Sequence, residues 1–325
     1  MAEFKRYLSP QLIGALNKLG DPSSAPNWWQ DVLKSRDLHL AVRGGYLNVY
    51  SKGQSIFKIG AESGPGLDKN GNPKVLIHYK YLLEPNRPRK EYICFNGTKF
   101  EIDPNEVICR EYEPGRTLNR LIDAASPYTS EEKKGVHVIA RNNPTVVDLE
   151  IAFTQTGETE DDPKALRIDL AALHPDGDGK AKLVFYEAKR ADDKRLRARP
   201  GGEPEVIKQM QSYDTFLRTS ASDLARAYMD VCSTLVKLYS RSSRWLPQII
   251  KVVGAESTKP SLSVDPVARL LVFGFDEDQK KGDNFKGDIE TLQRLLNRPV
   301  VAKGKPEAFD LEEDYKRFPP SAPVA

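Results

Sequence analysis

Near the N-terminus, hydrophobic positions recur at the spacing of a helix and then change to the spacing of strands. Over residues 3–19 the apolar side chains stand three or four positions apart, which predicts an amphipathic helix. From residue 38 to about residue 100, runs of β-branched and aromatic residues alternate with turn-rich segments such as residues 61–73. We therefore expect an N-terminal β-rich domain of unknown role at residues 1–105.

The tyrosines and cations of this β-rich region have two interpretations. They either alternate on a half-exposed sheet or form a face for nucleic acid. The residues concerned are Tyr46, Tyr50, Tyr79, Tyr81, Arg43, Lys52 and Lys80.

The middle of the chain carries several apolar segments in succession. Residues 117–126 predict a helix, and a second helix begins at Ser130 with two acids in its first turn. Strand-like alternation then covers residues 136–141, 146–153, 166–173 and 182–190. Because short, turn-rich connections favour antiparallel neighbours, we expect a meander that brings these segments side by side.

Helices and one further strand complete the pattern. A helical region is predicted from about residue 205 to 245, a strand at 268–275 and a last helix at 289–297. This order indicates an α+β fold with a small mixed sheet, which we place at residues 106–315. Residues 316–325 are rich in proline and are expected to be a disordered tail.

Charged side chains interrupt these strands at positions that would share a face. Glu187 and Lys189 stand two residues apart at the end of an apolar run, so both point the same way out of a strand. Asp169, flanked by apolar residues on the preceding strand, can face the same point. Glu150, one strand earlier, would extend the cluster, with Asp148 on its face. Two carboxylates and one ammonium at a sheet edge are the minimum for metal-assisted hydrolysis of a phosphodiester.

The expected cofactor is Mg²⁺ or Mn²⁺. A hard cation keeps several waters and needs only one or two protein carboxylates, here Asp169 and Glu187, with the carbonyl of Ala188 as a third oxygen. Lys189 would orient or help deprotonate an attacking water and offset charge in the transition state. The structural alternative is a set of rim charges that form cross-strand salt bridges, such as Lys189 with Asp169.

Composition permits this chemistry without requiring it. A chain of 325 residues that is 39% hydrophobic can bury a sizeable core. Charged residues make up 29% of the chain, yet the net charge is only +3, so a nucleic-acid surface must come from local clustering. The three cysteines form no CxxC pair, which argues against zinc, and no apolar run is long enough to span a membrane. The N-terminus lacks the pattern of a signal peptide, so we expect a soluble cytoplasmic protein.

Local clustering occurs directly after the Glu-Ala-Lys segment. Between residues 189 and 199, six basic residues stand against two acidic ones, which leaves a net charge of +4. This segment either neutralises DNA phosphates or is an ordinary solvated loop. The candidate phosphate-binding residues are Arg190, Lys194, Arg195, Arg197 and Arg199.

Gln209 and Tyr213 stand four residues apart on a predicted helix, so they share one face. The order Asp169, Glu187-Ala188-Lys189 and Gln209-x-x-x-Tyr213 resembles the PD-(D/E)xK nuclease superfamily, in particular its RecB-like branch, over roughly residues 116–275. The resemblance implies a restriction-endonuclease-like α-β-β-β-α-β core. It also implies Asp169 and Glu187 as metal ligands, Lys189 as the catalytic lysine, and Gln209 and Tyr213 as residues that support the site or touch the DNA backbone.

The resembling branch often carries a further acid or histidine on its first core helix. Glu113, Glu131 and Glu132 are candidates here, or Glu150 takes that role from its strand. The implied function is Mg²⁺-dependent hydrolysis of DNA phosphodiester bonds, as in restriction, repair or antiphage defence, with DNA favoured over RNA. The alternatives are a catalytically silent nuclease-like fold that binds nucleic acid or a protein, and a structural subunit that assembles through its N-terminal sheet.

Overall fold

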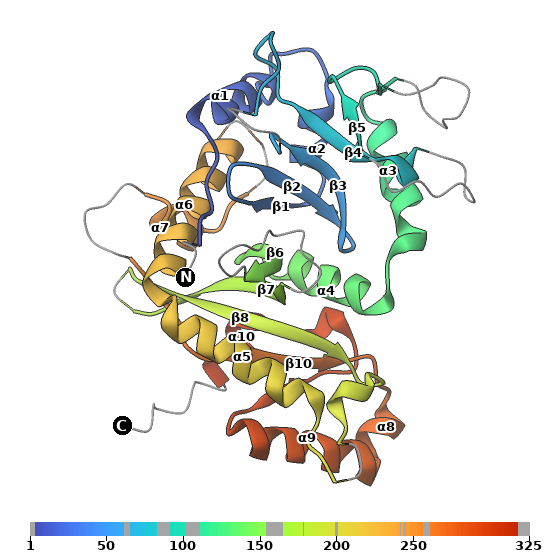
Figure 1. Ribbon diagram of the computed structural model, residues 1–325, viewed down its shortest axis with the longest axis vertical. Coiled ribbons are helices and arrows are strands. Elements are labelled where there is room, and N and C mark those ends of the chain that lie inside the picture. Colours follow the sequence, from blue (N-terminus) through green and yellow to red (C-terminus); the bar gives the residue numbers. More distant parts are fainter. Residues whose placement is uncertain are drawn as a thin grey trace. The chain divides into compact units, whose positions relative to one another are not determined.

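The computed structural model describes residues 4–61, 66–82, 92–101, 111–153, 165–177, 179–198, 201–240, 242, 245–255 and 261–317 (Figure 1). The chain forms two compact units. The N-terminal unit comprises Lys5–Ser130 and Ala227–Glu256, and the C-terminal unit comprises Met1–Phe4, Glu131–Arg226 and Ser257–Ala325. The N-terminal unit is thus larger than the predicted domain of residues 1–105, because it takes in helices from the middle and from the second half of the chain.

The N-terminal unit contains a five-stranded antiparallel sheet in which each strand pairs with its neighbours in the sequence. The strands are β1 (His39–Val42), β2 (Leu47–Ser51), β3 (Gln54–Ile59), β4 (Val75–His78) and β5 (Tyr92–Phe95). This meander confirms the predicted β-rich character. The helices of the unit are α1 (Pro10–Leu19), α2 (Trp28–Lys34), η1 (Tyr79–Tyr81), α3 (Thr117–Ala125), η2 (Ser126–Tyr128), α7 (Gln248–Val253) and, from Ala227, α6 (Ala221–Tyr239).

The first helix begins later than the hydrophobic pattern suggested. Ser9 accepts a hydrogen bond from the Leu12 N–H at 3.1 Å and so caps α1, and Pro10 occupies its first turn. Proline favours this position because its φ is already helical and it has no N–H to leave unbonded. The prediction of a helix from residue 3 was therefore wrong by about two turns.

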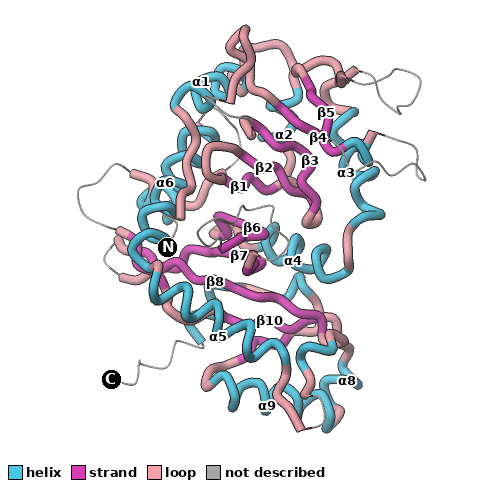
Figure 2. The backbone as a smooth tube through the Cα atoms, in the orientation of Figure 1, coloured by secondary structure: helices cyan, strands magenta, loops and turns pink. Residues whose placement is uncertain are grey.

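The C-terminal unit contains a six-stranded mixed sheet in the order β11-β10-β8-β7-β6. The sixth strand, β9, pairs with β8 along the edge of β8 that does not pair with β7. The strands are β6 (Val146–Phe153), β7 (Leu166–Pro175), β8 (Ala181–Arg190), β9 (Leu262–Val264), β10 (Arg269–Phe273) and β11 (Val300–Ala302). The strands β6, β7 and β8 form the predicted antiparallel meander, whereas β10 runs parallel to both β8 and β11. Figure 2 shows β8 between β7 and β10. An α+β fold with a mixed sheet is confirmed.

The helices of the C-terminal unit are α4 (Glu131–Asn142), η3 (Lys194–Leu196), α5 (Glu205–Thr219), α8 (Glu277–Lys281), α9 (Asp283–Leu296), η4 (Pro306–Ala308) and α10 (Leu311–Arg317). The elements therefore follow the order α4, β6, β7, β8, α5 and, after α6 and α7, β10. The last helix extends two residues into the predicted tail, and residues 318–325 lie outside the described part of the chain.

Two predicted elements differ in the structure. Residues 136–141, expected as a strand, belong to α4, where Val136, Ile139 and Ala140 are buried at helical spacing. The predicted helical region of residues 205–245 consists of the two helices α5 and α6, because the backbone of Ser220 leaves the helical conformation (φ -113°, ψ 12°) between them. Among the described residues, no helix has both the length and the hydropathy needed to cross a membrane.

Candidate active site

The strands β7 and β8 bring Asp169 and Glu187 to neighbouring positions. Their antiparallel ladder runs from Pro175 opposite Ala181 to Leu170 opposite Tyr186. Asp169 and Glu187 are the next residue on each strand. At this point the Ala188 N–H donates to Asp169 Oδ2 at 2.8 Å, so a side chain on the neighbouring strand accepts the bond.

Glu150 joins these two carboxylates from β6. The β6–β7 register pairs the residues on either side, so Glu150 lies opposite Asp169. Glu150 has a φ of 51°, a left-handed conformation that is uncommon for a residue with a side chain. Its Oε2 lies 3.1 Å from the ammonium of Lys133 on α4. Asp148 is fully buried and accepts a bond from the Leu149 N–H at 2.8 Å.

Lys189 is nearly inaccessible to solvent, with 3% of its side chain exposed. Its ammonium donates to Glu187 Oε1 and, at 3.3 Å, to the Ala188 carbonyl. It also lies 3.6 Å from Glu132 Oε1 on α4. The ion pairs of Lys189 are thus with Glu187 and Glu132, and the cross-strand salt bridge to Asp169 that we considered as a structural alternative is not formed.

Gln209 and Tyr213 lie on one face of α5, one turn apart, and hold both oxygens of Glu187. Gln209 Nε2 donates to Glu187 Oε1 at 2.9 Å, and the Tyr213 hydroxyl lies 3.0 Å from Glu187 Oε2. Gln209 also donates to the Tyr213 hydroxyl at 2.7 Å, and that hydroxyl contacts the carbonyl of Arg167. Tyr213 is fully buried. In this arrangement both residues orient Glu187.

Burial dominates the electrostatics of this cluster. Burial and then the neighbouring Glu187 raise the pKa of Asp169 well above its ordinary value. Burial also raises the pKa of Glu187, against the opposing effects of Lys189 and Tyr213. For Lys189, burial alone would lower the pKa, but Glu187, Asp169 and Glu132 together raise it. Lys189 is therefore an ammonium ion here, which favours a role as a cation over a role as a base.

The donor set fits a hard divalent cation such as Mg²⁺. The described part of the chain contains no group of three or more His, Cys, Asp or Glu residues arranged to hold a metal by themselves. Mg²⁺ does not need such a group, because it keeps several waters and takes one or two carboxylates. Among the described residues, none donates a hydrogen bond to Asp169 Oδ1, which leaves this oxygen available beside Glu187.

Two of the candidates for the further acid of the site lie near the cluster. Glu132 approaches Lys189, and Glu150 lies opposite Asp169. Glu131 is exposed and pairs with Lys134 at 2.6 Å. Glu113 belongs to the N-terminal unit, where it pairs with Arg116 at 3.2 Å. The contact of Lys133 with Glu150 was not predicted from the sequence. The position of Lys133 next to Glu132 in the same helix turn was the one signal for it.

The basic segment after β8 is largely engaged within the protein. Arg190 pairs with Asp192 at 3.0 Å, Arg195 binds Asp193, and Arg197 pairs with Asp288 of α9 at 3.0 Å. Lys194 is exposed in η3 and has no ion pair among the described residues, and Arg199 lies outside them. The net charge of +4 already subtracts Asp192 and Asp193. The further pairing of Arg197 with Asp288 and of Lys189 with Glu187 leaves less free positive charge than this sum.

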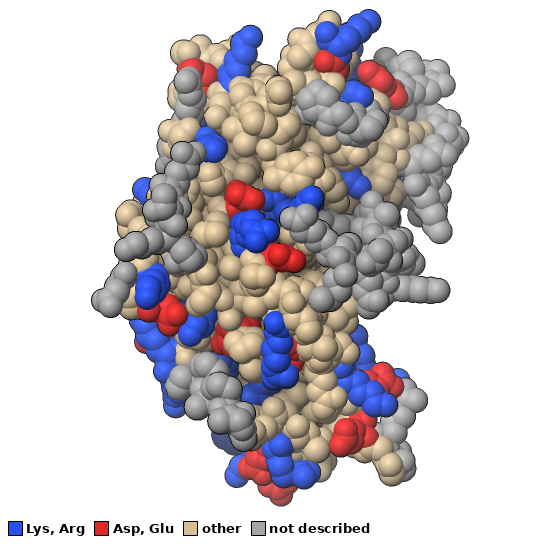
Figure 3. Space-filling view, turned by 60° about the vertical axis from the view of Figure 1, so that its left-hand side comes forward, with Lys and Arg blue, Asp and Glu red and all other residues tan. Residues whose placement is uncertain are grey.

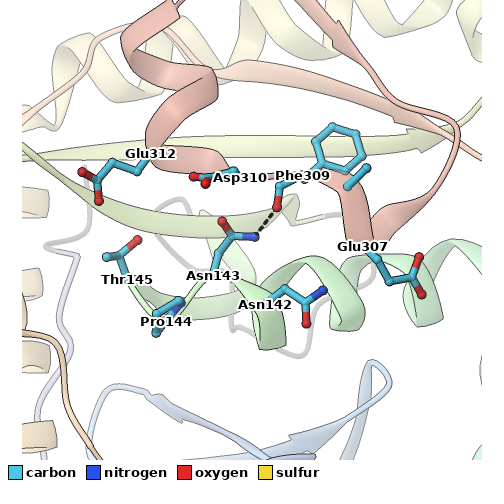
Figure 4. Close-up of a pocket in the computed structure, with 9 residues that line it drawn as sticks. Asn142, Asn143, Pro144, Thr145, Glu307, Phe309, Asp310 and Glu312 are labelled. Carbon is cyan, nitrogen blue, oxygen red and sulfur yellow. Dashed lines mark hydrogen bonds between the residues drawn. The ribbon is translucent and has the colours of Figure 1, made fainter.

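Figure 3 shows Lys and Arg beside Asp and Glu at several places on one face of the molecule, most of which is formed by other residues. Figure 4 shows a separate pocket beside the end of α4, lined among others by Asn143, Glu307 and Asp310, in which Asn143 donates to the Phe309 carbonyl at 3.0 Å.

Comparisons with known protein families, curated proteins and solved structures give no match for this chain.

Proposed function

We propose that the C-terminal unit is a metal-dependent nuclease that hydrolyses DNA phosphodiester bonds. The observation that carries the proposal is the convergence of Asp169, Glu187 and Lys189 at the end of the β7–β8 ladder. A buried carboxylate, Glu187, beside the half-buried carboxylate of Asp169 is unfavourable unless a cation neutralises the pair. Lys189 provides one positive charge, and the remaining negative charge, with an available oxygen on Asp169, supports binding of a divalent cation.

Each residue of the cluster has a distinct part in the proposed reaction. Bound Mg²⁺ would supply a Lewis acid and a water of lowered pKa. Asp169 and Glu187 would hold it, and Gln209 and Tyr213 fix the orientation of Glu187, as outer hydrogen-bond partners do for metal ligands. Lys189, kept protonated by its acidic neighbours, is placed to stabilise charge on a phosphate oxygen.

The order of the elements supports the same proposal. A helix, three antiparallel strands, a helix and a parallel strand occur in the order α4, β6, β7, β8, α5 and β10, with η3 before α5 and with α6, α7 and β9 before β10. This is the order that the resemblance to PD-(D/E)xK nucleases implies, and Asp169, Glu187 and Lys189 lie on the second and third of these strands. A role in restriction, repair or antiphage defence, and a preference for DNA, stay predictions of that resemblance.

A second candidate function is binding of nucleic acid or of a protein without cleavage. The observation that favours it is the engagement of Arg190, Arg195 and Arg197 with acidic partners of the same unit. Cations that are already paired release fewer counterions on binding DNA, so this observation favours a protein over nucleic acid as the ligand of a fold that does not cleave.

A cleavage assay separates these two functions. Plasmid, single-stranded DNA and RNA are incubated with the full chain in Mg²⁺, in Mn²⁺ and in EDTA. We expect metal-dependent cleavage of DNA that falls by about 100-fold or more in Asp169→Ala and in Lys189→Ala. Lys182→Ala is the matched control, because Lys182 lies on the same strand and pairs with Asp176, at 3.3 Å and away from the cluster. Cleavage that survives both substitutions excludes this site, and binding without cleavage in every condition favours the second candidate.

A further inference from the structure

Four aromatic side chains of the N-terminal unit meet around Lys80. His78 ends β4, Tyr81 lies in η1, Tyr92 begins β5, and Tyr128 ends η2. The ring centroid of His78 lies 5.1 Å from that of Tyr92 and 5.7 Å from that of Tyr81, and the Tyr81 and Tyr128 centroids are 6.3 Å apart. The four rings therefore form one continuous set, which together with Lys80 we call the aromatic patch; β4, β5 and α3 mark its place in Figure 1.

Two rings of the aromatic patch face solvent. Tyr92 is 49% exposed and Tyr128 is 42% exposed. Among the described residues, Tyr7 and Trp245 are the other large hydrophobic side chains with comparable exposure. Tyr81, at 3% exposure, lies beneath the exposed rings. Exposed apolar side chains that cluster, unlike those scattered singly, mark interaction sites.

A hydrogen-bond network fixes the ammonium of Lys80 against this patch. Lys80 Nζ lies 4.7 Å from the ring centroid of Tyr128 and 5.0 Å from that of Tyr81. It donates to Gln54 Oε1 at 3.1 Å, and the Tyr81 hydroxyl donates to the same oxygen at 3.1 Å. Gln54 in turn donates to the Tyr128 carbonyl at 3.0 Å. The ammonium of Lys80 and the rings of Tyr81 and Tyr128 are therefore held in one geometry before any ligand binds.

His78 contributes a neutral ring. Its Nδ1 accepts a hydrogen bond from the Lys80 N–H at 3.2 Å. Burial, with a smaller effect of Lys80, lowers the pKa of His78 to about 4. At neutral pH the aromatic patch thus presents uncharged aromatic faces and a single fixed ammonium.

We propose that the aromatic patch binds single-stranded nucleic acid, with bases stacked on Tyr92 and Tyr128 and a backbone phosphate near Lys80. Every base has a π-face, so aromatic rings beside a cation suit single strands of any sequence. A quaternary ammonium ligand fits less well, because Lys80 already occupies the space between the rings of Tyr81 and Tyr128. This binding does not depend on cleavage by the C-terminal unit.

The residues of the aromatic patch differ from those of the nucleic-acid face that the sequence suggested. Tyr79 is 4% exposed and Arg43 is 1% exposed, so neither is available to a ligand. Their place is taken by Tyr92, which lies in the same β-rich region but was not among the residues first considered, and by Tyr128, which lies beyond that region.

The test is fluorescence anisotropy with the full chain and labelled single-stranded DNA and RNA of about 12 nucleotides, within the usual site sizes for such proteins. EDTA is present, so that metal-dependent cleavage does not interfere. We expect affinity to fall about tenfold in Tyr92→Ala and in Tyr128→Ala, and to be retained in Tyr92→Phe, because stacking uses the ring and not the hydroxyl. Lys80→Met should also reduce the dependence of affinity on salt.

Tyr7→Ala is the matched control, because Tyr7 is 48% exposed in the same unit and is not part of the aromatic patch. The thermal unfolding midpoint of each variant shows whether that variant is folded. If Tyr128→Ala is unfolded, the affinity of Tyr92→Ala decides the result. The proposal is overturned if the wild-type chain binds no single strand, as expected if the patch contacts a protein instead. It is equally overturned if Tyr92→Ala binds as tightly as Tyr92→Phe, or if duplex DNA binds as well as single strands.

Discussion

At the scale of single residues, the two carboxylates proposed to bind a metal differ in how the protein holds them. Glu187 accepts hydrogen bonds from Lys189, Gln209 and Tyr213, which engage both of its oxygens. Asp169 accepts one bond, from the Ala188 N–H, and its other oxygen receives none from the described residues. Asp169 therefore has fewer hydrogen bonds to offset its negative charge than Glu187 has.

The first prediction concerns Asp169→Asn in the absence of metal. The pKa of Asp169 is raised in the folded chain, whereas in the unfolded chain it is about 3.9. Above pH about 4 the unfolded chain releases a proton that the folded chain retains, so this residue lowers stability as pH rises through the folded pKa. Asparagine can still accept the Ala188 N–H bond without carrying a charge.

We therefore expect Asp169→Asn to raise the free energy of unfolding at pH 7, because the pKa of Asp169 is raised in the folded chain. The gain in stability should disappear below pH about 4, where Asp169 is protonated in both the folded and the unfolded chain. Denaturant unfolding from pH 3 to pH 8 in EDTA measures this. A variant that is less stable than the wild type at every pH contradicts the assignment of a raised pKa.

The second prediction is that Mg²⁺ stabilises the folded chain through Asp169. A ligand at about 100 times its Kd stabilises a protein by about 2.7 kcal/mol if it binds only the folded state. We expect Mg²⁺ to raise the thermal unfolding midpoint of the wild type and to leave that of Asp169→Asn unchanged. Asp176→Asn is the control, because Asp176 pairs with Lys182 outside the cluster. An equal Mg²⁺ shift in Asp169→Asn places the metal elsewhere.

At the scale of elements, local periodicity predicted the parts of the cluster that lie on single strands and helices. Two-residue spacing predicted that Glu187 and Lys189 share a face, and four-residue spacing predicted the same for Gln209 and Tyr213. The approach of Glu132 to Lys189 could not be predicted, because it depends on how α4 packs on the sheet. The same packing explains the error at residues 136–141, where alternating apolar residues resemble a strand but Gly135 lets the helix approach closely.

The third prediction tests this close approach of α4. A Cβ added at Gly135 would lie 2.2 Å from Cε2 of Phe273 on β10, a buried ring. We expect Gly135→Ala to lower the free energy of unfolding by about 1–3 kcal/mol, the usual range for overpacking a core. Denaturant unfolding measures the change.

Gly287→Ala is the matched control for Gly135→Ala. Gly287 lies inside α9 of the same unit, and a Cβ there meets no atom within 4 Å. Alanine favours a helix over glycine by about 1 kcal/mol, so this variant should be more stable than the wild type. If Gly135→Ala is also stabilising, Phe273 moves aside freely and α4 is not fixed by this contact.

At the scale of the whole molecule, the division into two units depends on distant parts of the sequence. The hydrophobic pattern of α6 predicts which of its faces is buried, but it does not reveal which sheet covers that face. In the structure, Ala227–Glu256 belong to the N-terminal unit. They include buried side chains at Tyr228, Val231 and Leu238, which are at most 1% exposed. The sequence alone therefore does not show that the N-terminal unit extends beyond the predicted boundary near residue 105.

The last prediction follows from this composition of the N-terminal unit. A fragment of residues 1–130 keeps the five-stranded sheet but lacks Ala227–Glu256, which the same unit requires to bury its apolar surface. We expect the fragment to lack a cooperative thermal transition and to bind a hydrophobic dye, as states without specific packing do. Co-expression with residues 221–256 should restore a cooperative transition, because it returns the missing helices α6 and α7. If the fragment alone unfolds cooperatively at the midpoint of the full chain, then these helices are not part of its core, and the unit ends at Ser130.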